Sequence, residues 1–596
     1  MPSLSLRFLM LAATLLIAPV AVAFAIDPLQ ECSRLTDWTP ASVTGFAQTR
    51  KAGARLRSFL GSGKLKRLLD SNLGKTYLQS DDYRGLLENL SSIEQATSRK
   101  PLDLFDDLLG ADALLASRLT FTGGNEWLLL TRGKNKSALE AGRKALDAAI
   151  KANIGFPVQA KKTEYEGHSI EQLGEAWFTF LGDILAVSNS EKMVGEVIDL
   201  AYGRTEKSAS KSPAYSKAPA DDDFLARATI KPSFIPGIGA GIAGKVDEPA
   251  VSLLLGGIMG ALRGCELMTI SLDSSWSGVD LGLVLHPDDR GIAEKYSPFF
   301  PQTVDSEFES NIRKRKILGM VNLSRDFYQW WESSEEFLSS KAAGGLAQVS
   351  AALSMFMGGL NFQDEVLPAV GKTVSLVFRN QETGEGKPSP SPSIPGGALV
   401  LGLKDAKKKG RSFIVGFNSL VGIINFTRMQ QDSNAPSMLV RPEKVAGVDC
   451  YRVDLGLPAD PKEPGIEYNF SPTLAISGNR IILGSTFDLV KMLVEESEKS
   501  KTPGDTAVAA YARDRVYIDG KSAHSVFGKN LDFLAAQQVV EKGVNLAAAK
   551  AELKVIDELL SYIRGFEFES YRKKDSVHMD LKLGLITDTT IVEPAE

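Results

Sequence analysis

The sequence predicts an α+β fold made of two homologous halves, each a mostly antiparallel sheet with helices packed against it. The first observation behind this prediction is a repeated stretch, at residues 180–198 and again at 476–494. Aligned on Gly182 and Gly478, both copies read as a turn, an apolar strand, a small polar cap and an amphipathic helix. Each copy follows an extended segment, at 165–170 and at 445–451, so we expect one unit to occur twice.

The second observation is that the segments around this stretch follow one another in the same order in both halves. In the first half we expect a strand at 43–49, helices to residue 93, a hairpin at 113–131, a helix at 137–152 and, after the repeated stretch, a strand at 224–234, a helix at 249–262 and a strand pair at 266–286. In the second half we expect a strand at 317–324, helices to residue 360, a split hairpin at 373–403, a helix from 407 and, after the repeated stretch, a strand at 515–519, a helix at 546–563 and a strand pair at 565–585.

The third observation is that short turns join most of these strands, without a strict alternation of strand and helix. That pattern favours antiparallel pairing and an α+β class. A chain of 596 residues predicts several folding units. The predicted division is a signal peptide at 1–25, a first α+β repeat at 26–295, a second at 296–586 and a flexible tail at 587–596.

The N-terminus has the features of a secretory signal peptide. Arg7 provides the positive n-region, residues 8–22 are apolar, and Ala23 and Ala25 fit the small-x-small rule for cleavage after Ala25. An uncleaved anchor fits the short apolar region less well. Glu31 before Cys32 excludes a lipoprotein signal. We therefore expect a periplasmic or otherwise extracytoplasmic protein.

Charge and cysteine content restrict the classes of partner. A formal net charge of -5 gives no global field for nucleic acid, so no nucleic-acid partner is expected. An oxidising compartment permits one disulfide among the three cysteines, in which Cys32 would pair with Cys265 or Cys450. Isolated, half-buried thiols are the simpler interpretation, and the wide spacing of the cysteines predicts no metal site.

Motifs for a nucleotide or for a nucleophile occur only outside their required context. Gly239, Gly241 and Gly244 match G-x-G-x-x-G, but no parallel βαβ unit follows, so we expect a flexible glycine loop. Ser208 and Lys211 match S-x-x-K, but they lie in the low-complexity segment 203–222, which we expect to be a solvated loop. We expect 208–222 and the Pro-rich insertion 381–395 to be mobile.

The histidines and the acidic clusters predict no catalytic or metal centre. His168 and His578 fall in strand-like segments as surface or edge residues, His286 ends a strand, and His524 falls in a loop. No two of them have metal-ligand spacing. The acidic clusters at 221–223 and 288–289 are expected to be solvated turns. The sequence thus predicts no catalytic, cofactor-binding or metal-binding residues, and no cofactor.

Two helical segments without charged residues are the most suggestive physical feature. Residues 342–363 and 250–262 are rich in apolar and small residues, and Gly256 and Gly260 have G-x-x-x-G spacing. Core helices, a groove for an apolar ligand, and membrane insertion all fit such segments, and hydropathy alone does not separate the first two.

The repeated stretch resembles a family of exported bacterial proteins of uncharacterised function. The matching residues are Gly182-Asp-Ile-Leu-Ala-Val-Ser-Asn189 and Gly478-Asn-Arg-Ile-Ile-Leu-Gly-Ser485. The resemblance implies an exported protein with tandem α+β units, and it brings no catalytic residues with it.

Together these observations predict a non-enzymatic, exported protein that binds a protein or an apolar ligand in the cell envelope, with peripheral membrane contact. The alternatives are a lipid-handling carrier and an envelope hydrolase without a recognisable motif. The sequence indicates no oligomeric state.

Overall fold

The computed structural model describes residues 29–586, with gaps at 145–160, 218–223, 233–244, 302–306, 383–388, 459–463 and 501–511 and shorter ones elsewhere. The expected signal peptide, the tail 587–596, the acidic cluster 221–223 and the glycine motif 239–244 lie outside the described residues.

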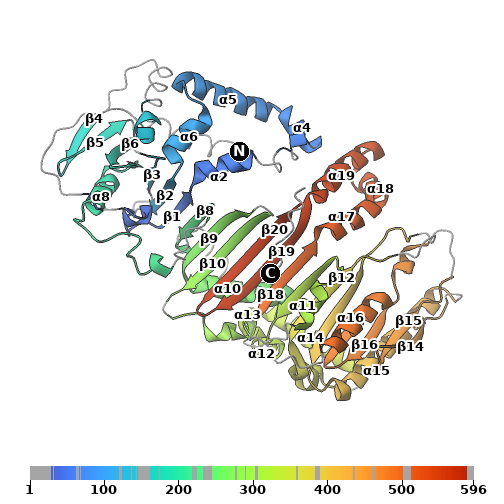
Figure 1. Ribbon diagram of the computed structural model, residues 1–596. Helices are drawn as coiled ribbons and strands as arrows, with labels where there is room; N and C mark the ends of the chain where they lie inside the picture. The colour runs from blue at the N-terminus through green and yellow to red at the C-terminus, as the bar shows by residue number, and fades with distance from the viewer. Residues whose placement is uncertain are drawn as a thin grey trace.

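The described strands form a single antiparallel sheet of twenty strands that runs through the whole molecule (Figure 1). The first ten are β1 (Gly45–Arg50), β2 (Asp112–Leu119), β3 (Asn125–Arg132), β4 (Lys161–Tyr165), β5 (His168–Leu173), β6 (Ala176–Leu181), β7 (Ile184–Ser188), β8 (Ala226–Ile230), β9 (Cys265–Ser275) and β10 (Gly278–Pro287). The second ten are β11 (Gly319–Ser324), β12 (Val370–Arg379), β13 (Gly396–Leu403), β14 (Leu439–Val445), β15 (Val448–Asp454), β16 (Thr473–Ser477), β17 (Arg480–Gly484), β18 (Arg513–Asp519), β19 (Ile563–Lys573) and β20 (Ser576–Leu585).

The strand order is the same in both sets of ten. The first set is paired in the order β4-β5-β6-β7-β3-β2-β1-β8-β9-β10. The second set is paired in the order β14-β15-β16-β17-β13-β12-β11-β18-β19-β20. The two sets meet at β10 and β20, which form eight cross-strand pairs, from Gly278 with Gly584 to Leu285 with Val577.

The register also agrees at the first residue of β1 and of β11, which is a glycine in both strands. Gly45 of β1 pairs with Ile230, and Gly319 of β11 pairs with Ile518. A Cβ at either glycine would come within 3 Å of the carbonyl oxygen of Thr229 or Tyr517. These close approaches explain why glycine occupies both positions. The prediction of a mixed helix and strand fold with a large antiparallel sheet is confirmed, while the boundary at residue 295 stays a prediction.

Helices cover parts of both faces of the sheet. In the first half they are α2 (Ala52–Leu60), α4 (Asn72–Leu78), α5 (Asp81–Thr97), α6 (Pro101–Leu109), α8 (Glu191–Ala201) and α10 (Pro249–Arg263), with the short turns η1 (Leu35–Asp37), η2 (Tyr215–Lys217) and η4 (Glu294–Phe299). In the second half they are α11 (Glu307–Arg313), α12 (Phe327–Glu332), α13 (Ser334–Phe337), α14 (Ser340–Phe356), α15 (Ala406–Gln431), α16 (Phe487–Lys499), α17 (Gly520–Lys529), α18 (Leu531–Lys542) and α19 (Leu546–Ser561), with the short turns η5 (Phe362–Val366), η6 (Leu367–Ala369) and η7 (Ile466–Asn469).

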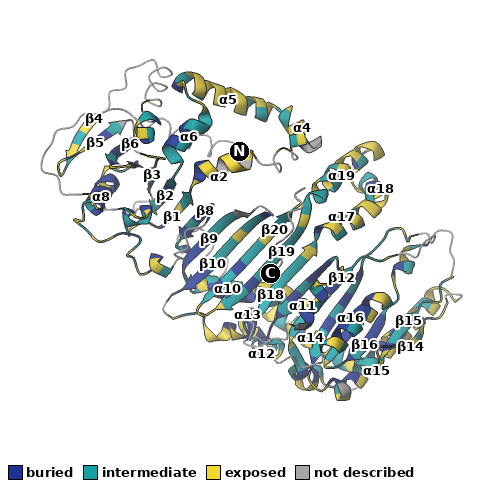
Figure 2. Ribbon diagram, in the orientation of Figure 1, coloured by how far each residue is buried: buried dark blue, intermediate teal, exposed yellow. Residues whose placement is uncertain are grey.

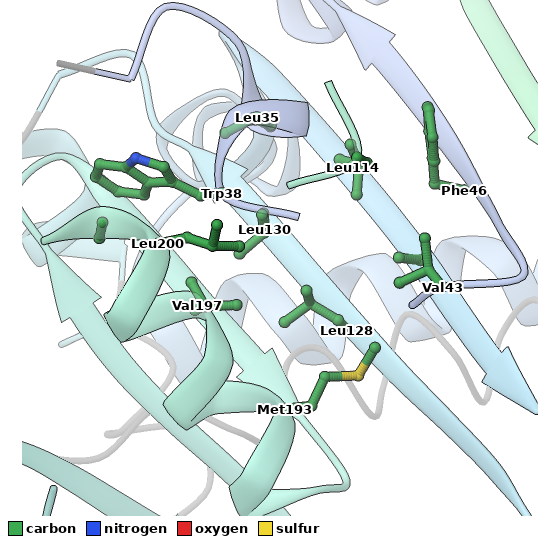
Figure 3. Close-up of a cluster of buried hydrophobic side chains, with 14 of the residues drawn as sticks. Leu35, Trp38, Val43, Phe46, Leu114, Leu128, Leu130, Met193, Val197 and Leu200 are labelled. Carbon is green, nitrogen blue, oxygen red and sulfur yellow. The ribbon is translucent and has the colours of Figure 1, made fainter. Parts of the chain in front are cut away.

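The repeated stretch forms the core of each half. In the first copy, Met193, Val197 and Leu200 of α8 point at Leu128 and Leu130 of β3 (Figure 3). In the second copy, α16 packs in the same way on β13 and β17. The turns before these helices place Gly182 and Gly478 at positive φ, of 65° and 58°, which glycine adopts without strain.

The glycines of α10 make a flat surface for aromatic rings. A Cβ at Gly256 would lie 2.3 Å from Phe299 Cζ, and a Cβ at Gly260 would lie 2.4 Å from the ring of Tyr296. These rings belong to a buried cluster that also contains Trp330, Phe337 and Leu346. The G-x-x-x-G spacing of Gly256 and Gly260 therefore allows aromatic rings of the same chain to pack closely on α10. Among the described helices, none has the length and hydropathy that a membrane crossing requires.

The expectation of a solvated loop at 203–222 is wrong for part of its described residues, while the expected mobility of 208–222 stays a prediction. Ser208, Ala209 and Tyr215 are buried. The Tyr215 hydroxyl donates to the carbonyl of Val43 at 2.6 Å, and its ring lies 5.2 Å from that of Phe46. One aromatic anchor and the backbone bonds around it hold a segment whose composition is otherwise polar.

Hydrogen bonds also hold the described ends of the insertion 381–395, whose expected mobility stays a prediction. The Gln381 side chain donates to the carbonyls of Ile394 and Asn469. The Asn530 side chain accepts from the backbone of Ser393 and donates to its carbonyl. Residues 383–388 lie outside the described part of the chain.

Arg325, just after β11, ties α10 to the second half. Its side chain is 2% exposed and binds both carboxylate oxygens of Asp514 in β18, at 2.6 and 2.7 Å. The same guanidinium donates to the carbonyls of Leu253 and Leu254 in α10. A planar group with five donors is suited to such a junction.

We expect Arg325→Met to lower the free energy of unfolding by about 3–5 kcal/mol, because it leaves Asp514 and two helix carbonyls without their donor. Urea unfolding of the full chain measures this loss. Arg441→Met is the matched control, because Arg441 makes an exposed ion pair with Asp454 and should cost about 0–1 kcal/mol. Equal effects of the two substitutions would contradict the assigned role of Arg325.

Candidate apolar binding face

A row of nine large apolar side chains crosses the middle of the sheet without a break. Each member is the direct cross-strand partner of the next, and we call this set the long row. In spatial order it consists of Leu272, Leu281, Leu581, Phe568, Val516, Val321, Leu376, Leu399 and Leu483. At about 4.8 Å between strands, the long row extends for roughly 38 Å.

A second row lies two residues further along the strands on the same face. This short row consists of Val279, Leu583, Phe566, Ile518, Gly319 and Phe378. The short row ends beside a second glycine, Gly397, where a Cβ would lie 3.4 Å from the Phe378 ring. Together the long row and the short row form what we call the apolar face.

The apolar face is incompletely covered. Leu281, Leu376 and Ile518 are 38–40% exposed, although all three lie in strands with a neighbour on each side. Figure 2 shows most of β9, β10, β19 and β20 at intermediate exposure. Toward α10 the same face is buried, since Met268, Leu285 and Met579 pack in the cluster that includes that helix. Among the described helices, α10 therefore covers one end of these strands, and the apolar face next to it stays partly exposed.

The opposite face of β18 and β19 is charged, whereas the opposite face of β11, β12, β13 and β17 is the apolar core under α16. Arg515 of β18 pairs with Glu309 at 2.5 Å and with Glu569 of β19 at 2.6 Å. Asn322 donates to the second carboxylate oxygen of Glu309 at 3.1 Å. Burial raises the pKa of Glu309, and Arg515 opposes this rise. Because successive side chains alternate in direction, β18 and β19 are polar on one side and apolar on the other.

The four histidines are not brought together as a catalytic centre. His168, in β5, is buried and stacks on Tyr202 with ring centroids 4.1 Å apart, so the expectation of a surface or edge position is wrong for it. His524 lies on α17, 3.1 Å from Asp557, and not in the expected loop. The Asp519 side chain accepts from the backbone N–H of Ser522 as the N-cap, and this cap begins the helix at Gly520.

One contact between a serine and a histidine occurs near the joint of the two halves. Ser576 Oγ lies 2.9 Å from His578 Nε2 in β20. The same hydroxyl donates to the carbonyl of Lys573 at 3.0 Å, so its proton is directed away from the imidazole. The His578 ring lies flat on Tyr571, with an interplanar angle of 7°. This arrangement does not activate the serine as a nucleophile.

The other chemical candidates are likewise separate. Ser208 Oγ lies 3.0 Å from Ser210 Oγ, and Lys211 pairs with Glu206. The three cysteines are free thiols, so the permitted disulfide is not formed. Burial raises the pKa of Cys32 to about 12 and that of Cys265 to about 11, which makes the thiolate rare. Within the described residues, no group of acidic, histidine or cysteine side chains could hold a metal ion.

The sequence contains a signal for the apolar face that the strand prediction used only in part. Residues 279–283, 566–568 and 581–583, within the predicted strand pairs at 266–286 and 565–585, alternate apolar residues with polar residues or glycine, which is typical of strands with one apolar side. Alternation does not show that β10 and β20 are neighbours in the sheet. It also does not tell whether a helix covers the apolar side.

Comparisons with known proteins add little to this geometry. No protein-family model matches the chain, and no curated protein matches it. Solved structures of TP0453 are similar in part. Crystal form IV matches at 12% identity and a TM-score of 0.22, covering 44% of this chain and 81% of that one. Crystal form III matches at 11% identity and a TM-score of 0.23, covering 46% of this chain and 84% of that one. Crystal form I matches at 10% identity and a TM-score of 0.22, covering 49% of this chain and 85% of that one. This is weak structural similarity, and it carries no argument about function.

The lowered pKa of His286 provides a test of whether its imidazole is buried in the neutral form. Burial, with His578 and Lys217 nearby, lowers the pKa of His286 from about 6.5 to about 4. The unfolded chain therefore binds a proton at pH 4–6.5 that the folded chain does not, and stability falls as the pH drops through that range. We expect this contribution to be about 2–3 kcal/mol, and we expect His286→Gln to remove it in urea unfolding at several pH values.

His524→Gln serves as the control for that experiment, because His524 is 38% exposed on its helix. The His524→Gln variant should still lose stability as the pH drops from 6.5 to 4, as the unchanged chain does. If His286→Gln unfolds with the same pH dependence as the unchanged chain, then the assignment of a neutral, buried imidazole is wrong.

Proposed function

We propose that this protein binds the acyl chains of an apolar ligand on the apolar face of its central sheet, and that it is a binding protein rather than an enzyme. The observation that carries the proposal is the long row, nine adjacent apolar side chains that no described helix covers completely. The two rows together occupy on the order of 400 Å², which is within the range of the largest apolar patches on monomers, and such patches are often functional.

The chemistry of the apolar face favours acyl chains over a polar ligand. Neither row contains a charged or hydrogen-bonding side chain. The backbone groups of these strands are used in ladders on both sides, so no strand edge is open for a partner strand. A ligand there gains mainly from burying apolar area. A bilayer core of about 30 Å holds two opposed acyl chains, so a row of roughly 38 Å has room for about two chains end to end.

We also infer that the two halves arose from one duplicated unit. The inference is supported by the identical strand order, by Gly45 and Gly319 in the same register, and by Gly182 and Gly478 in the same turn. Duplication would explain the apolar face itself, because the row becomes continuous only where β10 pairs with β20.

We place this activity outside the cytoplasm, in the cell envelope. Support comes from the signal-peptide features of residues 1–25 and from the resemblance of the repeated stretch to exported proteins. In that location an acyl-chain binder would act as a lipid-handling carrier.

The proposal is tested by titrating the full chain with a fluorescent long-chain fatty acid. We expect saturable binding. A triple variant, with Leu281→Gln, Leu376→Gln and Ile518→Gln, should bind about thirtyfold more weakly, because it removes roughly 2 kcal/mol of apolar contact. The three side chains are partly exposed, so the variant should keep its fold.

Leu439→Gln is the matched control, because Leu439 is an exposed apolar residue on the edge strand β14, outside the apolar face. It should leave the affinity unchanged. The proposal fails if the fatty acid does not bind, or if the triple variant and the control bind it equally well. Native mass spectrometry of protein purified from the envelope would identify a ligand that copurifies.

A further inference from the structure

The helix α15 presents an outer surface of unusual composition. It has 26 residues, which corresponds to about 39 Å of helix. From Ala406 to Gln431 it contains no aspartate or glutamate. Between Ser412 and Thr427 it contains no charged residue at all, over about four turns. Solvent-exposed helices normally carry charge on their outer face.

The exposed side of this helix is apolar. Val415, Ile423 and Phe426 are 45%, 49% and 61% exposed, and at 100° per residue they lie within about 80° of one another. Leu420 is 46% exposed beside them. The positions between them hold small residues, namely Ser412, Gly416, Ser419 and Gly422. We call the four apolar residues the outer stripe.

The inner side of α15 is fixed to the sheet. Phe417 and Val421 are buried against Leu474 and Ile481. The Asn425 side chain accepts from the backbone N–H of Met438 and donates to its carbonyl, both at 2.8 Å. The outer stripe is therefore displayed on a rigid support and does not become covered by a small rotation of the helix.

Positive charge lies at both ends of the outer stripe, with more of it at the N-terminal end of α15. Lys404, Lys408 and Arg411 are exposed around the first turns of α15, and Arg428 is the basic residue in its last turn. The neighbouring helix α14 also exposes apolar side chains, with Val349 at 49% exposure and Met355 at 80%. An exposed apolar stripe with basic residues at its end is typical of helices that lie in a membrane interface.

We propose that the outer stripe of α15 docks on the surface of an anionic lipid bilayer, with Lys408 and Arg411 at the headgroups. The helix would lie in the plane of the interface without crossing the bilayer. A symmetric contact with a second copy would instead bring α15 against α15, where the basic residues would find no acidic partner between Ala406 and Gln431 and would meet aspartate only at the caps, Asp405 and Asp432. Headgroups of anionic lipids supply the missing negative charge.

The test is flotation of the full chain with vesicles of phosphatidylcholine, with and without phosphatidylglycerol. We expect the unchanged chain to bind the anionic vesicles more strongly. The double variant Ile423→Gln and Phe426→Gln should bind about thirtyfold more weakly, since it removes the centre of the outer stripe. Lys408→Gln and Arg411→Gln should each reduce binding to anionic vesicles about fivefold, with little effect on neutral ones.

The triple variant of the apolar face is the control, because Leu281, Leu376 and Ile518 lie on strands away from α15. It should float with anionic vesicles like the unchanged chain, while the α15 double variant should keep its fatty-acid affinity, so the two proposals can fail separately. The docking proposal is overturned if the α15 double variant floats normally or if the vesicle charge has no effect. It is also overturned if the chain is a dimer that this variant dissociates and no vesicles bind.

Discussion

The pairing of β10 with β20 is the interaction on which the rest of the structure depends. Its eight cross-strand pairs turn two ten-stranded sheets into one, and they place Leu281 directly beside Leu581. The pairing also removes two strand edges that would otherwise be open to other chains. Of the described strands, β4 and β14 then remain at the ends of the sheet, and they carry Lys161, Lys162 and Pro442, which discourage further pairing.

The consequence of this joint is a sheet with two different sides. On one side Arg515, Glu309 and Glu569 form an ion-pair network that requires polar surroundings. On the other side the helices cover only one end of the strands, where Arg325 fixes α10 to β18. The uncovered end is the apolar face. Leaving it open costs the hydrophobic stabilisation that a covering helix would supply, which is the reason to assign it a ligand.

The fold class, the hairpins and the repeated stretch could be predicted because they depend on local patterns. The shared order of segments predicted the strand pairs that form β9, β10, β19 and β20, and Gly182 and Gly478 predicted the turns. The partner of β10 could not be predicted, because it lies about three hundred residues away and any apolar strand could have paired with it. The burial of Tyr215 was missed for a related reason, since one hydroxyl bond to Val43 outweighs the polar composition around it. The apolar helix segments were found, but their sequence did not indicate that α15, predicted only as a helix from Lys407, would expose the apolar side.

The most direct measurement of the central claim is photocrosslinking with a long-chain fatty acid that carries a diazirine near its methyl end, followed by peptide mapping of the full chain. The account predicts labels on β10, β20, β19 and β18, centred on Leu281, Leu581 and Phe568, because these strands join the two halves of the apolar face. Labels confined to other surfaces, with these strands unmodified, would contradict it.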